Sequence, residues 1–141
     1  MTSFMNTFNG PLSGLMQWQQ WENLLATITA SNDGRWYFYD VGETPPEEPL
    51  ETTQLPKFLT AIDKLIREEH QESFLGIVYA DNPDQPSLIR IYDPNSLGSV
   101  CGSSQMRVLP GWVISRYPPV DLQAEFPKPG NRRRWWKQLF A

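Results

Sequence analysis

The only cysteine of the chain lies in a loop that is rich in glycine and serine. Residues 98–104 read Gly-Ser-Val-Cys-Gly-Ser-Ser, and they follow an alternating strand pattern at residues 88–92. A thiol in such a loop acts as a nucleophile where a nearby base or a positive charge favours the thiolate, and glycines let a backbone approach a ligand closely. The sequence therefore indicates a candidate ligand or thiol site, which comprises Gly98, Cys101, Gly102, Ser103, Ser104 and Arg107.

This candidate site has plainer interpretations. His70 is the only histidine, it is flanked by acidic residues, and nothing in the sequence places it beside Cys101. The loop lacks the lysine and hydroxyl pair of a phosphate-binding loop and is not followed by a good helix start. Cysteine is also common as a small buried residue, and glycines are common in structural turns. The loop is therefore kept as the alternative site, and no catalytic residue is predicted.

Carboxylates for acid–base chemistry could come from Asp40, Asp93 and Asp121, each of which ends or interrupts an apolar run. Aspartate at such positions also hydrogen-bonds the local backbone, which is the simpler interpretation. One cysteine and one histidine cannot form a zinc site, and the acidic turn at residues 81–87 lacks the EF-hand pattern. We therefore predict no metal and no cofactor, and we favour a protein that is not an enzyme.

The segment 127–141 combines cations with large apolar side chains. It contains five of the twelve basic residues and none of the sixteen acidic ones. Arginine and tryptophan are enriched in binding hot spots, so we predict that this tail docks on a protein partner. The predicted contact residues are Arg132, Arg133, Arg134, Trp135, Trp136, Leu139 and Phe140.

Other interpretations of the tail remain open at this stage. Such a segment could stack on single-stranded nucleic acid, lie on an anionic membrane surface, or fold back onto its own domain. Residues 1–126 hold seven basic and sixteen acidic side chains, a charge of −9. Because this acidic body repels phosphates, the charge distribution argues against nucleic acid. Contact of the tail with a membrane surface is left as a possibility.

Length and composition indicate a small globular protein. A chain of 141 residues fits one domain, and one cysteine favours a reducing compartment. Residues 1–10 resemble no secretory signal, and no apolar run is long enough to span a membrane, so we expect a cytoplasmic protein without a transmembrane segment. We divide the chain into a frayed N-terminus (1–12), one domain (13–126) and the basic-aromatic tail (127–141).

Hydrophobic periodicity predicts two helices and several strands. The helices are expected at 14–30, capped by Ser13, and from a cap at Thr53 to about residue 70; the strands are expected at 35–41, 73–80, 88–92, 106–109 and 112–117. The strands at 73–80 and 88–92 form a hairpin. We therefore predict an α+β fold with a mostly antiparallel sheet of about three to five strands and both helices on one face. The expected function is that of a non-enzymatic accessory, assembly or regulatory factor.

Overall fold

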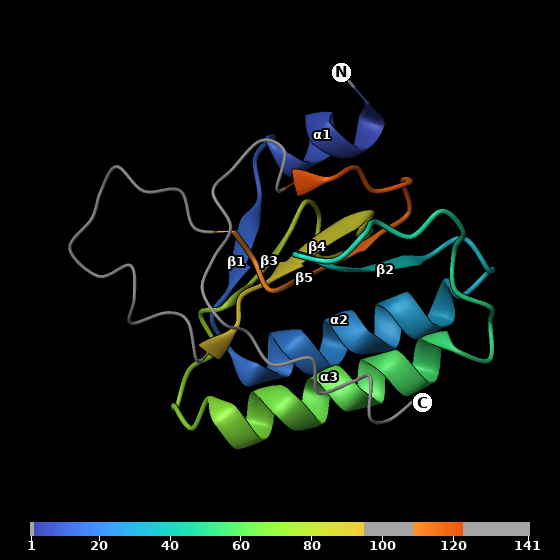
Figure 1. Cartoon of the computed structure of the whole chain (residues 1–141). Helices are drawn as coiled ribbons and strands as arrows, with labels where there is room; N and C mark the ends of the chain where they lie inside the picture. Colours follow the sequence, from blue (N-terminus) through green and yellow to red (C-terminus); the bar gives the residue numbers. More distant parts are fainter. Residues whose placement is uncertain (1, 95–108, 123–141) are drawn as a thin grey trace.

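The computed structural model describes residues 2–94 and 109–122, and within them it confirms the α+β fold (Figure 1). A five-stranded antiparallel sheet lies between two layers of helix. In chain order the elements are α1 (Ser3–Phe8), β1 (Ser13–Leu15), α2 (Trp18–Ala30), β2 (Tyr37–Asp40), α3 (Leu55–Glu69), β3 (Val78–Ala80), β4 (Leu88–Ile91) and β5 (Trp112–Ser115).

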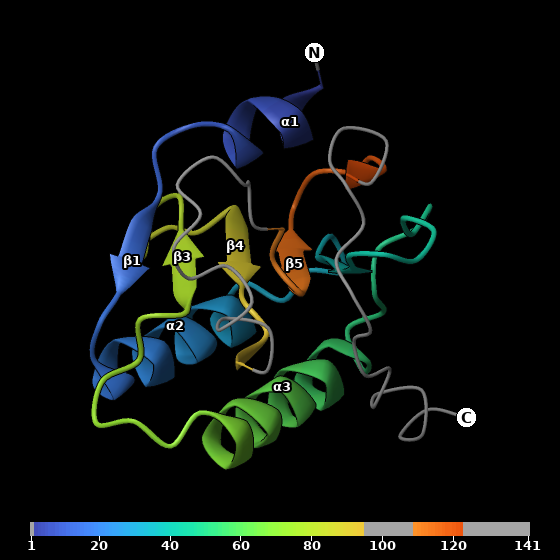
Figure 2. The same cartoon turned by 60° about the vertical axis from the view of Figure 1, so that its left-hand side comes forward.

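The strands follow the order β1-β3-β4-β5-β2, and each is antiparallel to its neighbours. The predicted hairpin is confirmed as β3 and β4, in which Val78 lies opposite Ile91. Asp81 fixes its turn, because one carboxylate oxygen accepts the backbone N–H of Ser87 at 2.8 Å and of Leu88 at 3.0 Å. β1 and β2 form the two edges (Figure 2). Residues 106–108 of the predicted short strand lie outside the described residues.

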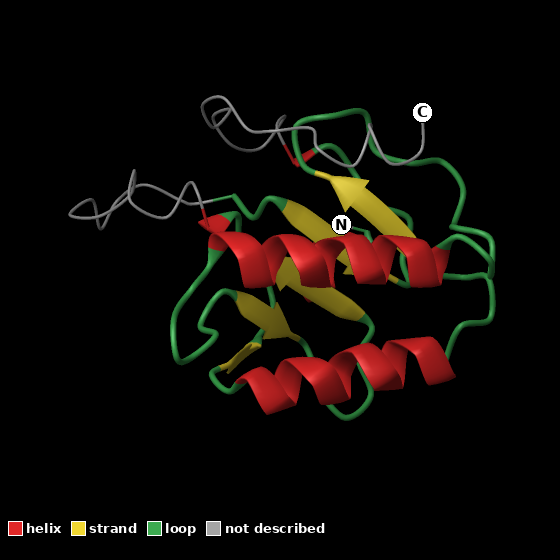
Figure 3. Cartoon of the chain, turned by 90° about the horizontal axis from the view of Figure 1, so that it is seen from below, coloured by secondary structure: helices red, strands yellow, loops and turns green. Residues whose placement is uncertain are grey.

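Helices α2 and α3 cover one face of the sheet, as predicted (Figure 3). α3 follows the predicted range closely, and its apolar stripe places Leu59, Ile62 and Ile66 in the main core. The two helices are joined by a polar contact as well, since the indole N–H of Trp21 donates to Asp63 at 2.8 Å. A buried indole N–H needs an acceptor, and this bond supplies one between the helices.

The first predicted helix begins later than expected, at Trp18 instead of Gly14. Residues 13–15 form edge strand β1, and Gln20 Oε1 accepts the N–H groups of Met16 and Gln17 at 2.9 and 2.8 Å to start the helix. Leu15 reaches the core from a strand, although its spacing also fits the helical stripe. A Cβ atom on Gly14 would lie 2.9 Å from the ring of Tyr79, so glycine allows this ring to cover the strand.

The N-terminal segment is also different from the frayed end that we expected. Residues 3–8 form α1, which is capped by Thr2, whose hydroxyl accepts the N–H of Met5 at 3.1 Å. Phe4, Met5 and Phe8 are buried against the sheet face opposite α2 and α3. Helix periodicity over six residues is too short to recognise in the sequence, but three large side chains on one face provide enough apolar area for docking.

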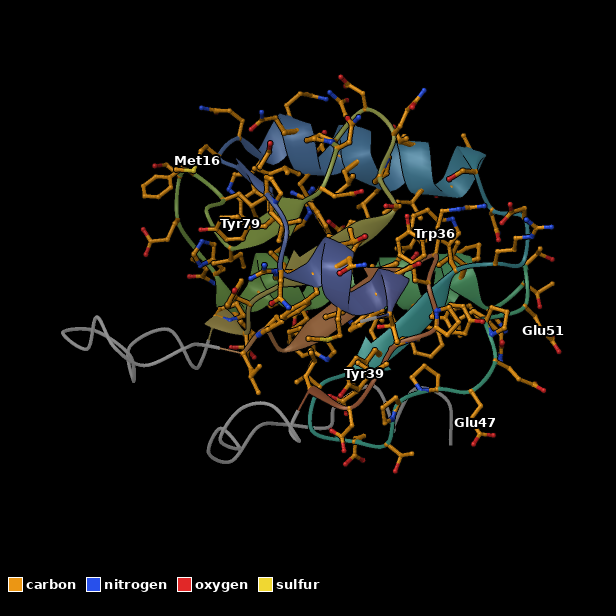
Figure 4. The ribbon with its side chains drawn as sticks, turned by 90° about the horizontal axis from the view of Figure 1, so that it is seen from above. Met16, Trp36, Tyr39, Glu47, Glu51 and Tyr79 are labelled. Atoms are coloured by element: carbon orange, nitrogen blue, oxygen red, sulfur yellow. The ribbon has the colours of Figure 1, made fainter. Side chains whose placement is uncertain are left out.

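The acidic, proline-rich segment 42–54 runs along the outer side of β2. The Leu50 N–H donates to the Trp36 carbonyl at 2.8 Å, and the Leu50 side chain packs on the main core. Glu47 and Glu51 lie at the periphery on this side of the molecule (Figure 4). The segment is therefore packed onto the domain, and it covers the β2 edge of the sheet.

Candidate functional site

The predicted site residues in the ranges 98–107 and 132–140 lie outside the described residues. The structure instead describes the residues that flank these two segments. The segment with the glycine-serine loop begins after Pro94 and ends before Leu109, and the described residues end at Leu122, five positions before the tail begins at residue 127. These attachment points define where each candidate site begins.

Both ends of the glycine-serine loop are attached at one end of the central strands. The Gly111 N–H donates to the Ile91 carbonyl at 2.9 Å, and the Gly111 carbonyl accepts the N–H of Val41 at 3.1 Å. A Cβ atom on Gly111 would lie 3.3 Å from Cβ of Asp93. Glycine at this position therefore lets the returning chain pack closely against the departing one, between the ends of β4 and β2.

Two buried carboxylates lie at the same end of the sheet. Asp40 is opposite Trp112, and Trp112 is opposite Ile91 in the next strand. Paired residues share a sheet face, so Asp40 lies on the side of α2 and α3, beside Trp112. Asp40 and Asp93 are 7% and 6% exposed, and both have interaction partners. Asp40 ends β2 and Asp93 follows β4, the two strands on either side of β5, so both carboxylates lie at the same end of the sheet.

Asp121, the third predicted carboxylate, is separate from this pair. It is exposed and precedes Leu122, whose N–H donates to the hydroxyl of Tyr39 at 3.1 Å. Tyr39 belongs to the cluster beneath α1, which is the opposite face of the sheet from Asp40. The structure therefore groups Asp40 with Asp93 and leaves Asp121 on the other side.

His70 has a local structural contact at the end of α3. Its Nε2 lies 2.6 Å from the Leu75 carbonyl, and because a carbonyl can only accept, the proton is on Nε2. The ring also packs near the indole of Trp18, whose own N–H donates to the Glu72 carbonyl at 3.0 Å. The hydrogen bond from Nε2 therefore joins the end of α3 to the segment that precedes β3, and Nε2 is not free to act as a base.

Arg90 has a structural role that the sequence did not reveal. Its guanidinium donates to the carbonyl of Phe8 at the end of α1, lies 4.3 Å from the Phe8 ring centre and donates to the Tyr92 hydroxyl at 3.3 Å. A cation at a helix C-terminus is favourable because the last carbonyls carry partial negative charge. The only available signal was an arginine inside the alternating strand pattern of residues 88–92.

A second arginine joins β5 to the turn after α2. The Arg116 guanidinium lies 2.5 Å from Asp33, donates to the Ser31 carbonyl at 3.3 Å and lies over the Trp36 ring. The hydrogen bond from Arg116 holds the pKa of Asp33 below its ordinary value. Asp33 therefore stays charged at neutral pH, and the contact is part of the fold.

The described residues contain neither a metal-binding cluster nor a membrane-spanning helix. Within residues 2–94 and 109–122, no group of three His, Cys, Asp or Glu side chains converges to hold a metal ion. None of the helices in these ranges has the length and apolar character needed to cross a membrane. Comparisons of the chain with family models, with curated proteins and with solved structures find no match.

Proposed function

We propose that this protein is a non-enzymatic accessory, assembly or regulatory factor that binds a protein partner through its basic-aromatic tail. The contact residues are those predicted from the sequence, Arg132–Arg134, Trp135, Trp136, Leu139 and Phe140. The observation that carries the proposal is the separation of charge between the folded part and the tail. The described residues hold six basic and fifteen acidic side chains, whereas residues 127–141 hold five basic and no acidic ones.

Three of the four arginines in the described residues make contacts within the domain. Arg67 pairs with Asp63 and Glu22, and Arg90 and Arg116 make the contacts with α1 and Asp33 described above. These three cations make their contacts with other residues of the domain. The tail, by contrast, concentrates arginine and tryptophan, the residue types that most often supply binding energy at protein interfaces.

The start of the tail also fits a docking arm. Leu122 is fully buried beneath α1, and its N–H is fixed by Tyr39. The segment 127–141 therefore follows a firm attachment point on the domain. About fifteen residues in extended form span up to about 50 Å, which is enough to reach a partner surface beside the domain.

The first prediction compares the aromatic and cationic parts of the tail. We expect Trp135→Ala with Trp136→Ala to reduce partner capture at least about tenfold, because buried aromatic side chains contribute more than rim charges. Arg132→Ala with Arg133→Ala should cost less and should lose its effect as salt rises, since exposed charges are screened. The measurement is the amount of host protein retained by the immobilised full chain and by each double variant.

Deletion of residues 128–141 provides the control for folding. The truncated protein should keep the circular dichroism and the melting temperature of the full chain while losing the partner. Unfolding of the truncated domain would show that the tail belongs to the core. A dominant effect of the arginine pair, with tight binding to oligonucleotides or to anionic vesicles at low salt, would favour those ligands over a protein.

We retain a ligand or thiol site at Gly98–Arg107 as the second candidate function. The observation that favours it is the attachment of both ends of this loop beside the buried carboxylates Asp40 and Asp93. Binding residues are often carried on loops that a rigid scaffold positions, and the attachment points here belong to the sheet.

Alkylation of the native protein tests this second candidate. An activated Cys101 should react with iodoacetamide at neutral pH at least about tenfold faster than free cysteine, because the thiolate is the reacting form. The rate is followed by mass spectrometry on the intact chain, with Cys101→Ser as the control for other sites. A rate equal to or below that of free cysteine would count against a reactive thiol.

A further inference from the structure

The two edge strands of the sheet, β1 and β2, differ in how far other described residues cover them. The outer side of β2 is covered by segment 42–54, with its prolines and its glutamates, whereas no described residue pairs with the outer side of β1 (Figure 2). Proteins commonly protect a bare edge with charges, prolines or a covering loop, because unpaired backbone groups accept another strand. The β2 edge has such protection. Among the described residues no segment covers the β1 edge, although at its end the Met16 N–H is bonded to Gln20 and the Met16 carbonyl to Leu75.

The exposed apolar side chains of the described residues lie at this bare edge. Met16 and Phe74 are the two large hydrophobic residues that are exposed, at 50% and 51%. The Leu75 N–H donates to the Met16 carbonyl at 2.8 Å, so the two side chains come from neighbouring segments. Figure 4 shows Met16 and Tyr79 on the side of the molecule away from Glu47 and Glu51. A bare strand and exposed apolar side chains together indicate an interaction surface.

The strand at this edge also carries no charged side chain, and Glu72, whose carbonyl accepts the indole N–H of Trp18, is an acidic residue near its Met16 end. From Met1 to Trp21 there is no Asp, Glu, Lys, Arg or His. Asp81 lies near the other end of the β1 and β3 pair, but its carboxylate is engaged by the backbone of Ser87 and Leu88. A cationic partner would therefore be attracted to segment 42–54, and the β1 edge suits an equally uncharged strand.

We propose that the occupant of the β1 edge is β1 of a second copy of this chain. An antiparallel edge pairs with its own copy around a two-fold axis without any further complementarity, and the two sheets become continuous. A register centred on Gly14 sets Met16 opposite Leu12 of the second copy, which joins two apolar side chains on one face. The absence of charge removes the like-charge contacts that would oppose this pairing.

The interface is small, so the dimer is expected to be weak. A three-residue strand with two flanking side chains buries less than the roughly 1,600 Å² of a standard interface, which places the dissociation constant above about 10 μM. Sedimentation velocity of the full chain from about 10 μM to about 1 mM should show a shift from monomer to dimer over this range. Over the same range, amide hydrogen exchange in residues 11–17 should slow as the concentration rises.

Substitution of Met16 separates local pairing from general charge effects. Met16→Lys changes the net charge from −4 to −3, which on its own would reduce repulsion between copies and strengthen association. We expect it instead to weaken dimerisation at least about tenfold, because it places two cations beside the shared edge. Thr60→Lys, at an exposed position of α3, makes the same change in net charge away from the edge and should leave the dimer intact.

Three results would overturn the proposal. The first is a monomer at every concentration with constant exchange in residues 11–17. The second is a dimer that Met16→Lys and Thr60→Lys affect equally. The third is protection of residues 11–17 that does not depend on concentration and disappears in full-length protein carrying Trp135→Ala and Trp136→Ala, since the tail of the same chain would then occupy the edge. Equal melting temperatures of all variants confirm that each is folded.

Discussion

Replacement of Ile62 by aspartate is expected to destabilise the protein by about 4 kcal/mol or more. Ile62 lies in the middle of α3 with no solvent exposure, inside the main core between the helices and the sheet. A carboxylate at that position loses its hydration and gains no partner, and the apolar contacts of the isoleucine are lost as well. Because a small domain is stable by only about 5–15 kcal/mol, a large fraction of its stability disappears. Urea unfolding followed by circular dichroism measures the change.

Thr60→Asp is the matched control for this substitution. Residue 60 is exposed on the same helix, and threonine and aspartate have similar helix propensities, so its cost should stay within about 0.5 kcal/mol. The pair of variants adds the same carboxylate two positions apart. If Ile62→Asp unfolded at the same urea concentration as Thr60→Asp, α3 would not cover the sheet in the way described.

Phe4→Ala is expected to cost about 3 kcal/mol and to release α1 from the sheet. Phe4 is fully buried, stacks on Phe8 with ring centres 5.9 Å apart and meets the edge of Tyr39 at 6.3 Å. A six-residue helix is not stable by itself in water, so α1 depends on this docking. Its loss should uncover Tyr39 and Val113, and amide exchange in residues 3–8 should become fast.

Asn6→Ala tests whether any change in α1 has the same effect. Asn6 is exposed on the same helix, and alanine favours a helix, so stability should be unchanged or slightly higher. If the first twelve residues were frayed in solution, Phe4→Ala and Asn6→Ala would behave alike. Similar unfolding curves and equally fast exchange for both variants and the unmodified protein would therefore contradict the docking of α1.

Long, strongly periodic elements could be predicted from the sequence. α3 carries a wide apolar stripe over four turns, and the β3 and β4 hairpin has two apolar runs around a proline-containing turn. The first pattern is typical of an amphipathic helix and the second of a β-hairpin, and the structure confirms both elements. The fold class follows from them, because a long amphipathic helix beside an antiparallel hairpin requires a layered α+β arrangement.

Short elements depended on tertiary contacts that no local pattern reveals. Leu15 fits both a helix stripe and a strand, and its pairing with Val78 decides between them. α1 is stabilised by Phe4 and Phe8 against residues more than thirty positions away. The contact of Arg90 with α1 could not be predicted, because α1 itself was not foreseen from the sequence. The site residues predicted in segments 98–107 and 132–140 lie outside the described residues, and they remain predictions.

The order of the strands has a consequence for synthesis on the ribosome. β2 is synthesised early, but its partner in the sheet is β5. Tyr37 can therefore pair with Ser115 only after β5 has been synthesised. α1 likewise meets Arg90, 82 positions after Phe8. Contacts between such distant residues form slowly, and the pairing of β2 with β5 cannot exist while the nascent chain ends before β5. The aromatic N-terminal half must therefore leave the ribosome without its sheet partners, and a nascent chain stalled before residue 112 should be bound by chaperones more strongly than the finished protein.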